Sequence, residues 1–302
     1  MSQNHTPQYQ PCQAAALGDR GVLRVAGPDA QKFLQGVLTN DLDKLDQGGA
    51  IHAGLLSPQG KILFDFFVIC QPGGADGSSF LIEAPKESLA ALQKRLSFYR
   101  LRAQLDVVEV PTFTVAAVWD GLPEITCGAI AFADPRLPEL GWRVLLPEGT
   151  SVADLACVEA RENTYQARRI ALGVPEGGRD YPLGDTFPHE ALFDQLHGVD
   201  FEKGCFVGQE VVSRMEHRGT TRKRVVPVEG DVPLQTGTEI MAGDLPVGTI
   251  GTVDGRSGLA LLRLDRAEAA LSKGTPLQAD GATLALRRPA FASFDVPGAS
   301  PT

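Results

Sequence analysis

The sequence lacks long apolar runs. No stretch of its 302 residues approaches the roughly 20 consecutive apolar residues that a membrane-spanning helix needs. The first eleven residues are polar and contain no apolar signal core, so we expect no membrane contact and a cytoplasmic location. Apolar residues make up 43% of the chain and charged residues 22%, which is ordinary for a folded globular protein of two or three domains.

Basic residues are scarce, because 28 of them face 37 acidic residues and give a net charge of -9. Proteins that coat nucleic acid are usually basic, so any such contact must be local. One candidate is the row Arg214, Arg218 and Arg222, which Lys223 and Arg224 extend. Such a row can hold a polyanion or be a solvated face, and no aromatic residue interleaves with it. Direct nucleic-acid binding is therefore not expected, and an RNA-binding accessory protein is the least favoured hypothesis.

Cysteine is also scarce, and no CxxC pair occurs among the five cysteines: Cys12, Cys70, Cys127, Cys157 and Cys205. A dedicated zinc or iron–sulfur cage is therefore not expected, and we predict no metal site. In a reducing compartment all five should be free thiols, and the four other than Cys205 lie in apolar segments typical of buried cysteines. A nucleophile elbow of the form G-x-S-x-G is absent too, which disfavours a hydrolase.

The pattern of elements indicates an α+β protein without strict βαβ alternation. Alternation and spacing predict strands at 21–26 and 62–69, a short helix around 33–38, and a long helix from about 152 to 172. Residues 174–190 are rich in proline and glycine, which is typical of a functional loop or a crossing between domains. After Arg224, short strands and the turn signals Asp254-Gly255 and Asp280-Gly281 predict a small β-barrel.

The most informative segment surrounds Cys205. This cysteine lies just upstream of an expected helix start, where Lys203 and unpaired helix amides would favour a thiolate. Gly204 and Gly208 would let backbone amides approach a ligand. The alternative is that Cys205 is one more buried small residue. The segment reads Lys203-Gly204-Cys205-Phe206-Val207-Gly208-Gln209-Glu210, with Arg214 following.

This segment resembles the signature of the YgfZ-type folate-binding proteins, a branch of the aminomethyltransferase-like family whose mitochondrial relatives assist iron–sulfur cluster assembly. The resemblance extends from about residue 17 to 288. It implies two ferredoxin-like domains and a distorted C-terminal β-barrel in a ring around a central pocket. The implied boundaries are a split domain at 1–47 and 106–222, an inserted domain at 48–105 and the barrel at 223–302.

The resemblance also implies a function. The cofactor would be tetrahydrofolate or a one-carbon derivative, held near Lys61, Asp65 and Arg169, with Cys205 as the functional thiol. The role would be assembly or repair of iron–sulfur proteins, including cluster enzymes that modify tRNA. Partners would be folate and iron–sulfur client or assembly proteins, and we expect a monomer.

A second hypothesis is a true folate-dependent aminomethyltransferase like the glycine-cleavage T-protein. That family typically has paired aspartates where this chain has Phe64-Asp65, and a glutamate where it has Ala171. These departures disfavour aminomethyl transfer and leave open whether the chain is an enzyme.

Overall fold

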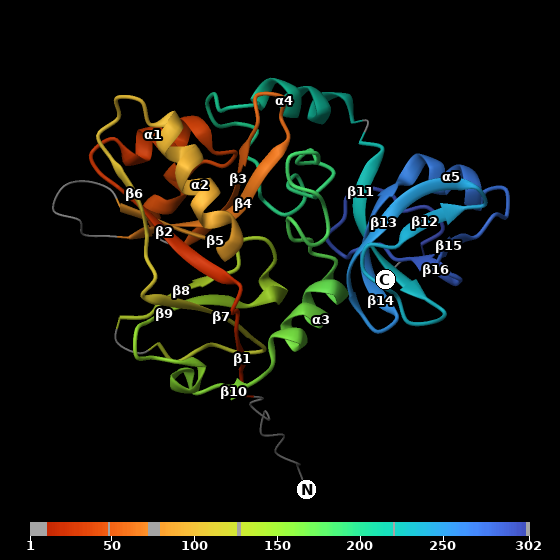
Figure 1. The fold of residues 1–302 in the computed structure, drawn as a ribbon, viewed down its shortest axis with the longest axis horizontal. Helices are drawn as coiled ribbons and strands as arrows, with labels where there is room; N and C mark the ends of the chain where they lie inside the picture. The colour runs from red at the N-terminus through yellow and green to blue at the C-terminus, as the bar shows by residue number, and fades with distance from the viewer. Residues whose placement is uncertain (1–10, 48, 72–78, 126–127, 220, 300–302) are drawn as a thin grey trace, which may run out of the picture.

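The computed structural model describes residues 11–47, 49–71, 79–125, 128–219 and 221–299 (Figure 1). It is a mixed α+β fold of two open five-stranded sheets and one closed barrel, which confirms the expected class. Within the described ranges, no helix is both long and apolar enough to cross a bilayer.

The first sheet has the strand order β3-β4-β5-β2-β6 and carries two helices. Leu34 of one helix and Leu89, Leu92 and Leu96 of the other are buried in its core, as their three- and four-residue spacing predicts. The elements are β2 (Arg20–Ala26), α1 (Ala30–Val37), the 3-10 helix η1 (Leu42–Gln47), β3 (Ala50–Leu56), β4 (Ile62–Gln71), β5 (Ser79–Pro85), α2 (Lys86–Tyr99) and β6 (Asp106–Glu109).

The second sheet has the order β10-β1-β7-β9-β8. The long helix expected over 152–172 is wrong, because Ala156 adopts a left-handed conformation (φ 53°) and a short strand follows it. The helix begins only at Glu162. The elements are β1 (Gln13–Ala16), β7 (Phe113–Trp119), β8 (Ile130–Ala133), η2 (Pro138–Leu140), β9 (Trp142–Pro147), η3 (Val152–Leu155), β10 (Val158–Glu159) and α3 (Glu162–Leu172).

The two sheets are nested in the sequence. β2 pairs with both β5 and β6, so the chain enters and leaves the first sheet on neighbouring strands. The expected domain boundaries at 47/48 and 105/106 therefore divide one hydrogen-bonded sheet. β2 precedes the first boundary, β5 lies between the two, and β6 follows the second, yet β2 pairs with both others. We propose that the inserted unit spans roughly the range from β2 to β6, and that β1 alone precedes it in the second sheet.

The C-terminal unit is a closed barrel in the order β11-β14-β13-β12-β15-β16, and β11 closes it by pairing with β16. Closure leaves no free sheet edge. The hairpins expected at Asp254-Gly255 and Asp280-Gly281 are present between β13 and β14 and between β15 and β16. The elements are β11 (Lys223–Gly230), β12 (Glu239–Ala242), β13 (Leu245–Asp254), β14 (Ser257–Arg263), α5 (Leu264–Leu271), β15 (Leu277–Ala279) and β16 (Ala282–Leu286).

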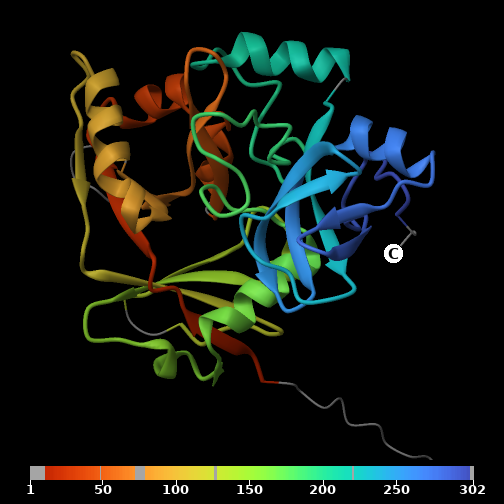
Figure 2. The ribbon, with the colours of Figure 1, turned by 45° about the vertical axis from the view of Figure 1, so that its right-hand side comes forward.

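An irregular segment, residues 173–208, joins α3 to α4 (Gln209–Arg218). Figures 1 and 2 show its green and teal loops between the two sheets and the barrel, with α4 along the upper edge of the molecule. The segment that joins the domains in sequence thus also lies between them in space.

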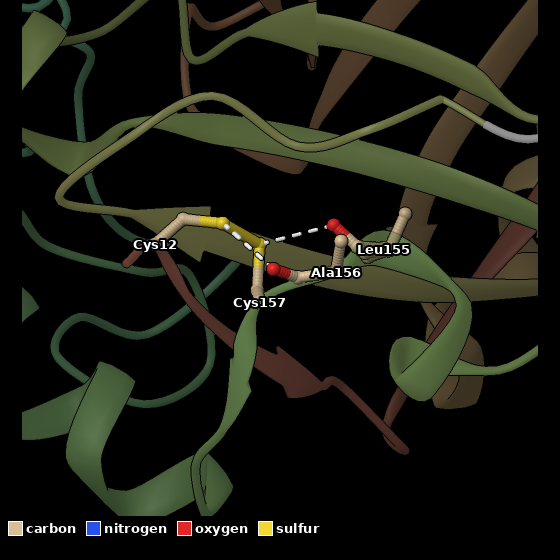
Figure 3. The surroundings of a disulfide bond; sticks show 4 residues. All are labelled: Cys12, Leu155, Ala156 and Cys157. Carbon is tan, nitrogen blue, oxygen red and sulfur yellow. Dashed lines mark hydrogen bonds between the residues drawn. A yellow bond between two sulfur atoms is a disulfide. The ribbon is translucent and has the colours of Figure 1, made fainter. Parts of the chain in front are cut away.

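The expectation of five free thiols is wrong. Cys12 and Cys157 form a disulfide that joins the start of β1 to the residue before β10, and their Cα atoms are 4.8 Å apart (Figure 3). The pairing escaped prediction because 145 positions separate the two residues. Cys70 is half-buried, Cys205 is an exposed free thiol, and Cys127 lies outside the described residues.

Candidate functional site

Cys205 lies on an exposed loop that leads into α4. The loop rests on the turn between β3 and β4. Gly208 adopts φ 82° as the N-cap of α4, and a Cβ there would lie 2.6 Å from the Ser57 carbonyl oxygen. Only glycine fits this combination of conformation and close approach. Burial of Cys205 as a small core residue, the alternative considered above, is therefore wrong.

Lys203 holds the loop in place through hydrogen bonds to backbone carbonyl groups around the end of α1. Its Nζ donates hydrogen bonds to the carbonyl oxygens of Gln35, Leu38 and Asn40, at 2.8, 2.7 and 2.8 Å. Burial lowers the pKa of Lys203 to about 8, against the opposing effect of nearby Asp41. The ammonium is thus committed to the C-terminal end of α1, and we assign Lys203 to positioning the loop. Among the described residues, no hydrogen bond or ion pair joins Lys203 to Cys205. The expected stabilisation of a Cys205 thiolate by Lys203 therefore has no contact to support it.

The rest of the signature surrounds the start of α4. Gln209 and Glu210 form its first turn, half-buried and exposed respectively, and no side chain caps the helix amides. Gly204 is exposed, and a Cβ there would meet no atom within 4 Å, so its role is not steric. Arg214 is exposed on α4. The exposed thiol, the uncapped amides and a cation therefore belong to one short segment that favours anionic ligands.

The basic row beyond Arg214 does not form one stripe. α4 ends at Arg218, with Gly219 in a left-handed conformation, so Arg222 lies beyond the helix. Arg224 is buried and donates two hydrogen bonds to Asp194, at 2.9 and 2.8 Å. A continuous polyanion site over 214–224 is therefore absent from the part of the chain that the structure describes.

The three predicted folate contacts lie in different surroundings. Asp65 uses one carboxylate oxygen to accept hydrogen bonds from the Tyr181 hydroxyl (2.6 Å) and the Gly177 amide (3.1 Å). Lys61 Nζ lies 3.5 Å from the ring centroid of Phe187 and donates to the backbone. Neither residue lines the cavity that adjoins Gly177.

Arg169 is fully buried, and protein groups accept hydrogen bonds from four of its five guanidinium N–H donors. It donates to the Val174 carbonyl, to Asp180, to the Gln166 side chain and to the Thr252 hydroxyl. These partners lie on α3, on the irregular segment and on β13. Arg169 therefore ties the barrel to α3 and to the irregular segment, and most of its donors are already used by the protein.

A cavity of about 400 Å³ opens beside the irregular segment. Burial alone would raise the pKa of Glu176, but Arg169 and Arg20 outweigh it and lower that pKa to about 2. Its carboxylate forms ion pairs at 3.7 Å with Arg169 and Arg179, and no hydrogen-bond donor reaches it among the described residues. The cavity is lined by Asp19, Arg20, Pro85, Lys86, Glu87, Glu176, Gly177 and Arg179.

Glu176 meets the chemical requirement of a folate. The pterin ring presents adjacent N–H donors that a carboxylate can accept, and Glu176 is ionised and retains hydrogen-bonding capacity. Asp65 and Arg169 fit less well because neither lines this cavity, and because protein groups already bind one oxygen of Asp65 and four N–H groups of Arg169. The available sequence signal for Glu176 is an acidic residue within the long segment rich in proline and glycine.

Sequence reasoning missed a buried charged group between the sheets. Arg136 donates to Asp134 at 2.8 Å, and Arg143 donates to the Tyr165 hydroxyl at 2.8 Å. All four side chains are buried. The available signal was Arg143 itself, a charge within the otherwise apolar strand β9.

Comparisons with known proteins agree with this architecture. Residues 222–294 match the family described as the CAF17 C-terminal β-barrel domain. The glycine cleavage system aminomethyltransferase T from Bartonella henselae superposes with a TM-score of 0.73 over 94% of this chain and 87% of that one. Its sequence is 16% identical, so the likeness concerns the fold.

Two relatives carry closer sequence similarity. The human iron–sulfur cluster assembly factor IBA57, mitochondrial, is 36% identical over 82% of this chain and 76% of its own length. The homologue of Mycosarcoma maydis is 35% identical over 80% of this chain, and the chain spans 60% of that relative's length.

These relatives are named as mitochondrial proteins, so the cytoplasmic expectation is wrong. The absence of an apolar signal core at residues 1–11 did not decide the compartment. The extent and identity of the match to the human protein show that this chain belongs to the IBA57 family of the aminomethyltransferase fold.

Proposed function

We propose that this chain assists iron–sulfur cluster assembly or repair, with Cys205 as a thiolate ligand that contacts a cluster or its carrier. The exposed thiol on a fixed loop is the observation that carries the proposal. Relatives named as iron–sulfur cluster assembly factors support it. In keeping with the YgfZ-type resemblance, we include cluster enzymes that modify tRNA among the clients.

The chemistry follows from a single accessible thiol. Iron–sulfur clusters are held by several cysteine thiolates, so one cysteine needs a second protein to complete the ligand set. No group of three or more metal-binding side chains occurs within the described ranges, and Cys205 has no second cysteine in its segment. We therefore infer that the cluster is shared with, or passes to, an assembly or client protein. Uncapped amides of α4 favour the approach of an anionic cluster.

The test is replacement of Cys205 in cells that depend on this protein, with the activity of a cluster enzyme as readout. Cys205→Ala should abolish rescue, whereas Cys205→His keeps an iron-binding side chain and should retain part of it. Because Cys205 is exposed, both variants should keep their free energy of unfolding within about 0.5 kcal/mol. Full rescue by Cys205→Ala would remove the thiol from the mechanism.

Folate binding is a second part of the proposal, supported by the Glu176 cavity. Glu176 would accept the N–H donors of the pterin ring, and Lys86, an exposed cation at the cavity, can attract the glutamate tail. Asp65 and Arg169 would act through the segment that carries Glu176, since they bind Gly177 and Asp180. Bound tetrahydrofolate would supply a one-carbon carrier.

Calorimetric titration with tetrahydrofolate under anaerobic conditions tests this part. Glu176→Gln should weaken binding at least tenfold, while Cys205→Ala should bind as the wild type does. Glu87→Gln, at a solvent-exposed carboxylate of the same cavity, is the matched control. Equal affinity of Glu176→Gln and wild type would exclude the cavity.

Aminomethyl transfer gains no comparable support. Ala171, which replaces the glutamate of the T-protein pattern, is exposed on α3 and does not line the Glu176 cavity. Likeness to the aminomethyltransferase structure extends to the fold only.

A further inference from the structure

Two large apolar side chains project from the end of α2. Phe98 is 71% exposed, and Leu101, just beyond the helix, is 89% exposed. Leu101 also adopts a left-handed backbone conformation with φ 46°, which costs energy for a leucine. An exposed apolar residue in a strained conformation is a feature that folding alone does not require.

Cations surround these two side chains. Lys94 and Arg95 are exposed and lie four and three positions before Phe98, so they neighbour it on the helix surface. Arg100 and Arg102 flank Leu101 directly. The chain carries a net charge of -9, so this short basic segment contrasts with the average of the molecule.

A hollow of about 600 Å³ adjoins the same turn. Arg24 of β2 lines it together with Arg100, Leu101 and Arg102. Asp106 forms an ion pair with Arg100 at 3.4 Å. Among the described residues, neither Arg24 nor Arg102 has a side-chain hydrogen bond or ion pair. Two uncommitted guanidinium groups therefore face a space large enough for a phosphate-bearing head group.

Against the expectation of no membrane contact, we propose that this turn, residues 98–106 with Arg24, binds the surface of membranes that contain anionic phospholipid. The arginine hollow would take a lipid phosphate, and Phe98 and Leu101 would enter the boundary between head groups and acyl chains. In both views the segment between α2 and β6 lies at the outer edge of the molecule, where a flat surface can reach it (Figures 1 and 2). This surface would act in addition to Cys205 and does not depend on the proposed cluster chemistry.

The observations favour a membrane over nucleic acid or a protein. A nucleic acid could bind the arginines and stack a base on Phe98. Leu101, which is 89% exposed, offers neither charge nor an aromatic face for such a ligand. A protein hot spot is usually enclosed by neighbouring contacts, whereas these side chains protrude. Protruding apolar residues ringed by cations match a deformable anionic surface.

Sedimentation of the full chain with lipid vesicles tests the proposal. The wild type should bind phosphatidylcholine vesicles that contain phosphatidylglycerol and not vesicles of phosphatidylcholine alone. Phe98→Ser/Leu101→Asn should reduce binding at least tenfold, and asparagine tolerates the left-handed conformation. Arg24→Gln/Arg102→Gln should reduce it as much. Circular dichroism checks that each variant is folded.

Matched controls remove similar groups elsewhere. Arg256→Gln/Lys273→Gln takes two exposed charges from the barrel, and Leu122→Ser removes another exposed apolar side chain; both should bind like the wild type. Phe98→Trp should show a blue-shifted emission with anionic vesicles. Inorganic phosphate at fixed ionic strength should compete weakly, because it offers no apolar contact.

Three results would overturn the proposal. The first is no binding to anionic vesicles, and the second is binding that neither double variant reduces. The third is displacement by inorganic phosphate together with an unchanged Phe98→Trp spectrum, which would indicate a soluble phosphate ligand. Binding of single-stranded RNA that depends on Arg24 and Arg102 but not on Phe98, without vesicle binding, would instead assign the turn to nucleic acid.

Discussion

The centre of the ring and the Cys205 loop use polar groups in opposite ways. In the centre, Arg169 and Arg136 find their partners within the chain, at Asp180 and Asp134. At the loop, all three N–H donors of Lys203 bind carbonyl oxygens around the end of α1, while the Cys205 thiol is exposed. The bonds of Arg169 therefore join α3 to the irregular segment and the barrel, and the free thiol lies at the surface.

The comparison shows why charged residues at the middle of an aminomethyltransferase-type fold need not indicate a reactive centre. Buried ion pairs are poor evidence of net stabilisation, but removing one partner is costly because the other charge remains buried. Glu176 is the intermediate case, since it is ionised by its neighbours yet retains hydrogen-bonding capacity towards a cavity. Substitutions in the two regions should consequently differ in kind as well as in size.

The largest effect is expected at Arg169. Arg169→Ala leaves Asp180 buried without its cation and should lower the free energy of unfolding by about 3–5 kcal/mol. The neighbour Arg168, which pairs with Asp120 near the surface, is the control, and Arg168→Ala should cost under about 1 kcal/mol. Urea denaturation measures both. Equal costs would show that the buried pair does not tie the ring together.

A pH dependence should come from His52. Burial, followed by repulsion from Arg136, lowers the pKa of His52 to about 4 from 6.5. Between pH 6.5 and 4, His52 is protonated in the unfolded chain but not in the folded one. The free energy of unfolding therefore falls as the pH drops from 6.5 to 4. The loss from this residue is about 3 kcal/mol.

Replacing His52 by glutamine should flatten that part of the stability curve. Denaturant midpoints at several pH values between 7 and 4, for wild type and His52→Gln, measure it. Surface His217, exposed on α4, is the control, and His217→Gln should leave the slope unchanged. An identical slope in all three proteins would mean that folding does not lower the pKa of His52.

The smallest effect on stability, and the most specific one, is expected at Lys203. Lys203→Met leaves three carbonyl acceptors at the end of α1 without their donor and should cost about 1–3 kcal/mol. The loop should also loosen, so Cys205 should react faster with a thiol reagent. Lys44→Met, at a half-exposed lysine that pairs with Asp200, should change neither quantity appreciably. Unchanged thiol reactivity in Lys203→Met would refute the anchoring role.

Local signals predicted much of this fold. Residue spacing located the short helix that includes Leu34, and Asp254-Gly255 located a hairpin, because each signal and its consequence lie within a few residues. The break at Ala156 was not predictable, since alanine is a good helix former and the competing strand β10 forms by pairing with β1 across the fold.

Within the candidate site, the limit was distance along the chain. The position of Cys205 just before a helix start followed from the motif, whereas the motif left open whether the thiol is buried. The partners of Lys203 lie 163–168 positions away, and those of Asp65 lie 112 and 116 positions away. Sequence could name these residues but could not tell a group reserved for a ligand from one used by the protein itself.

The nested order of the two sheets has a consequence for biosynthesis. β1 leaves the ribosome first, yet its partners β7 and β10 emerge about a hundred residues or more later. The chain passes between the second sheet and the inserted one at residues 17–19 and 110–112, and β2 and β6 are adjacent. Folding of the inserted unit therefore brings β1 and β7 together and removes most of the loop-closure entropy from their pairing. The inserted unit, which carries α1 and the carbonyl oxygens that bind Lys203, thus aligns β1 and β7 of the unit that encloses it.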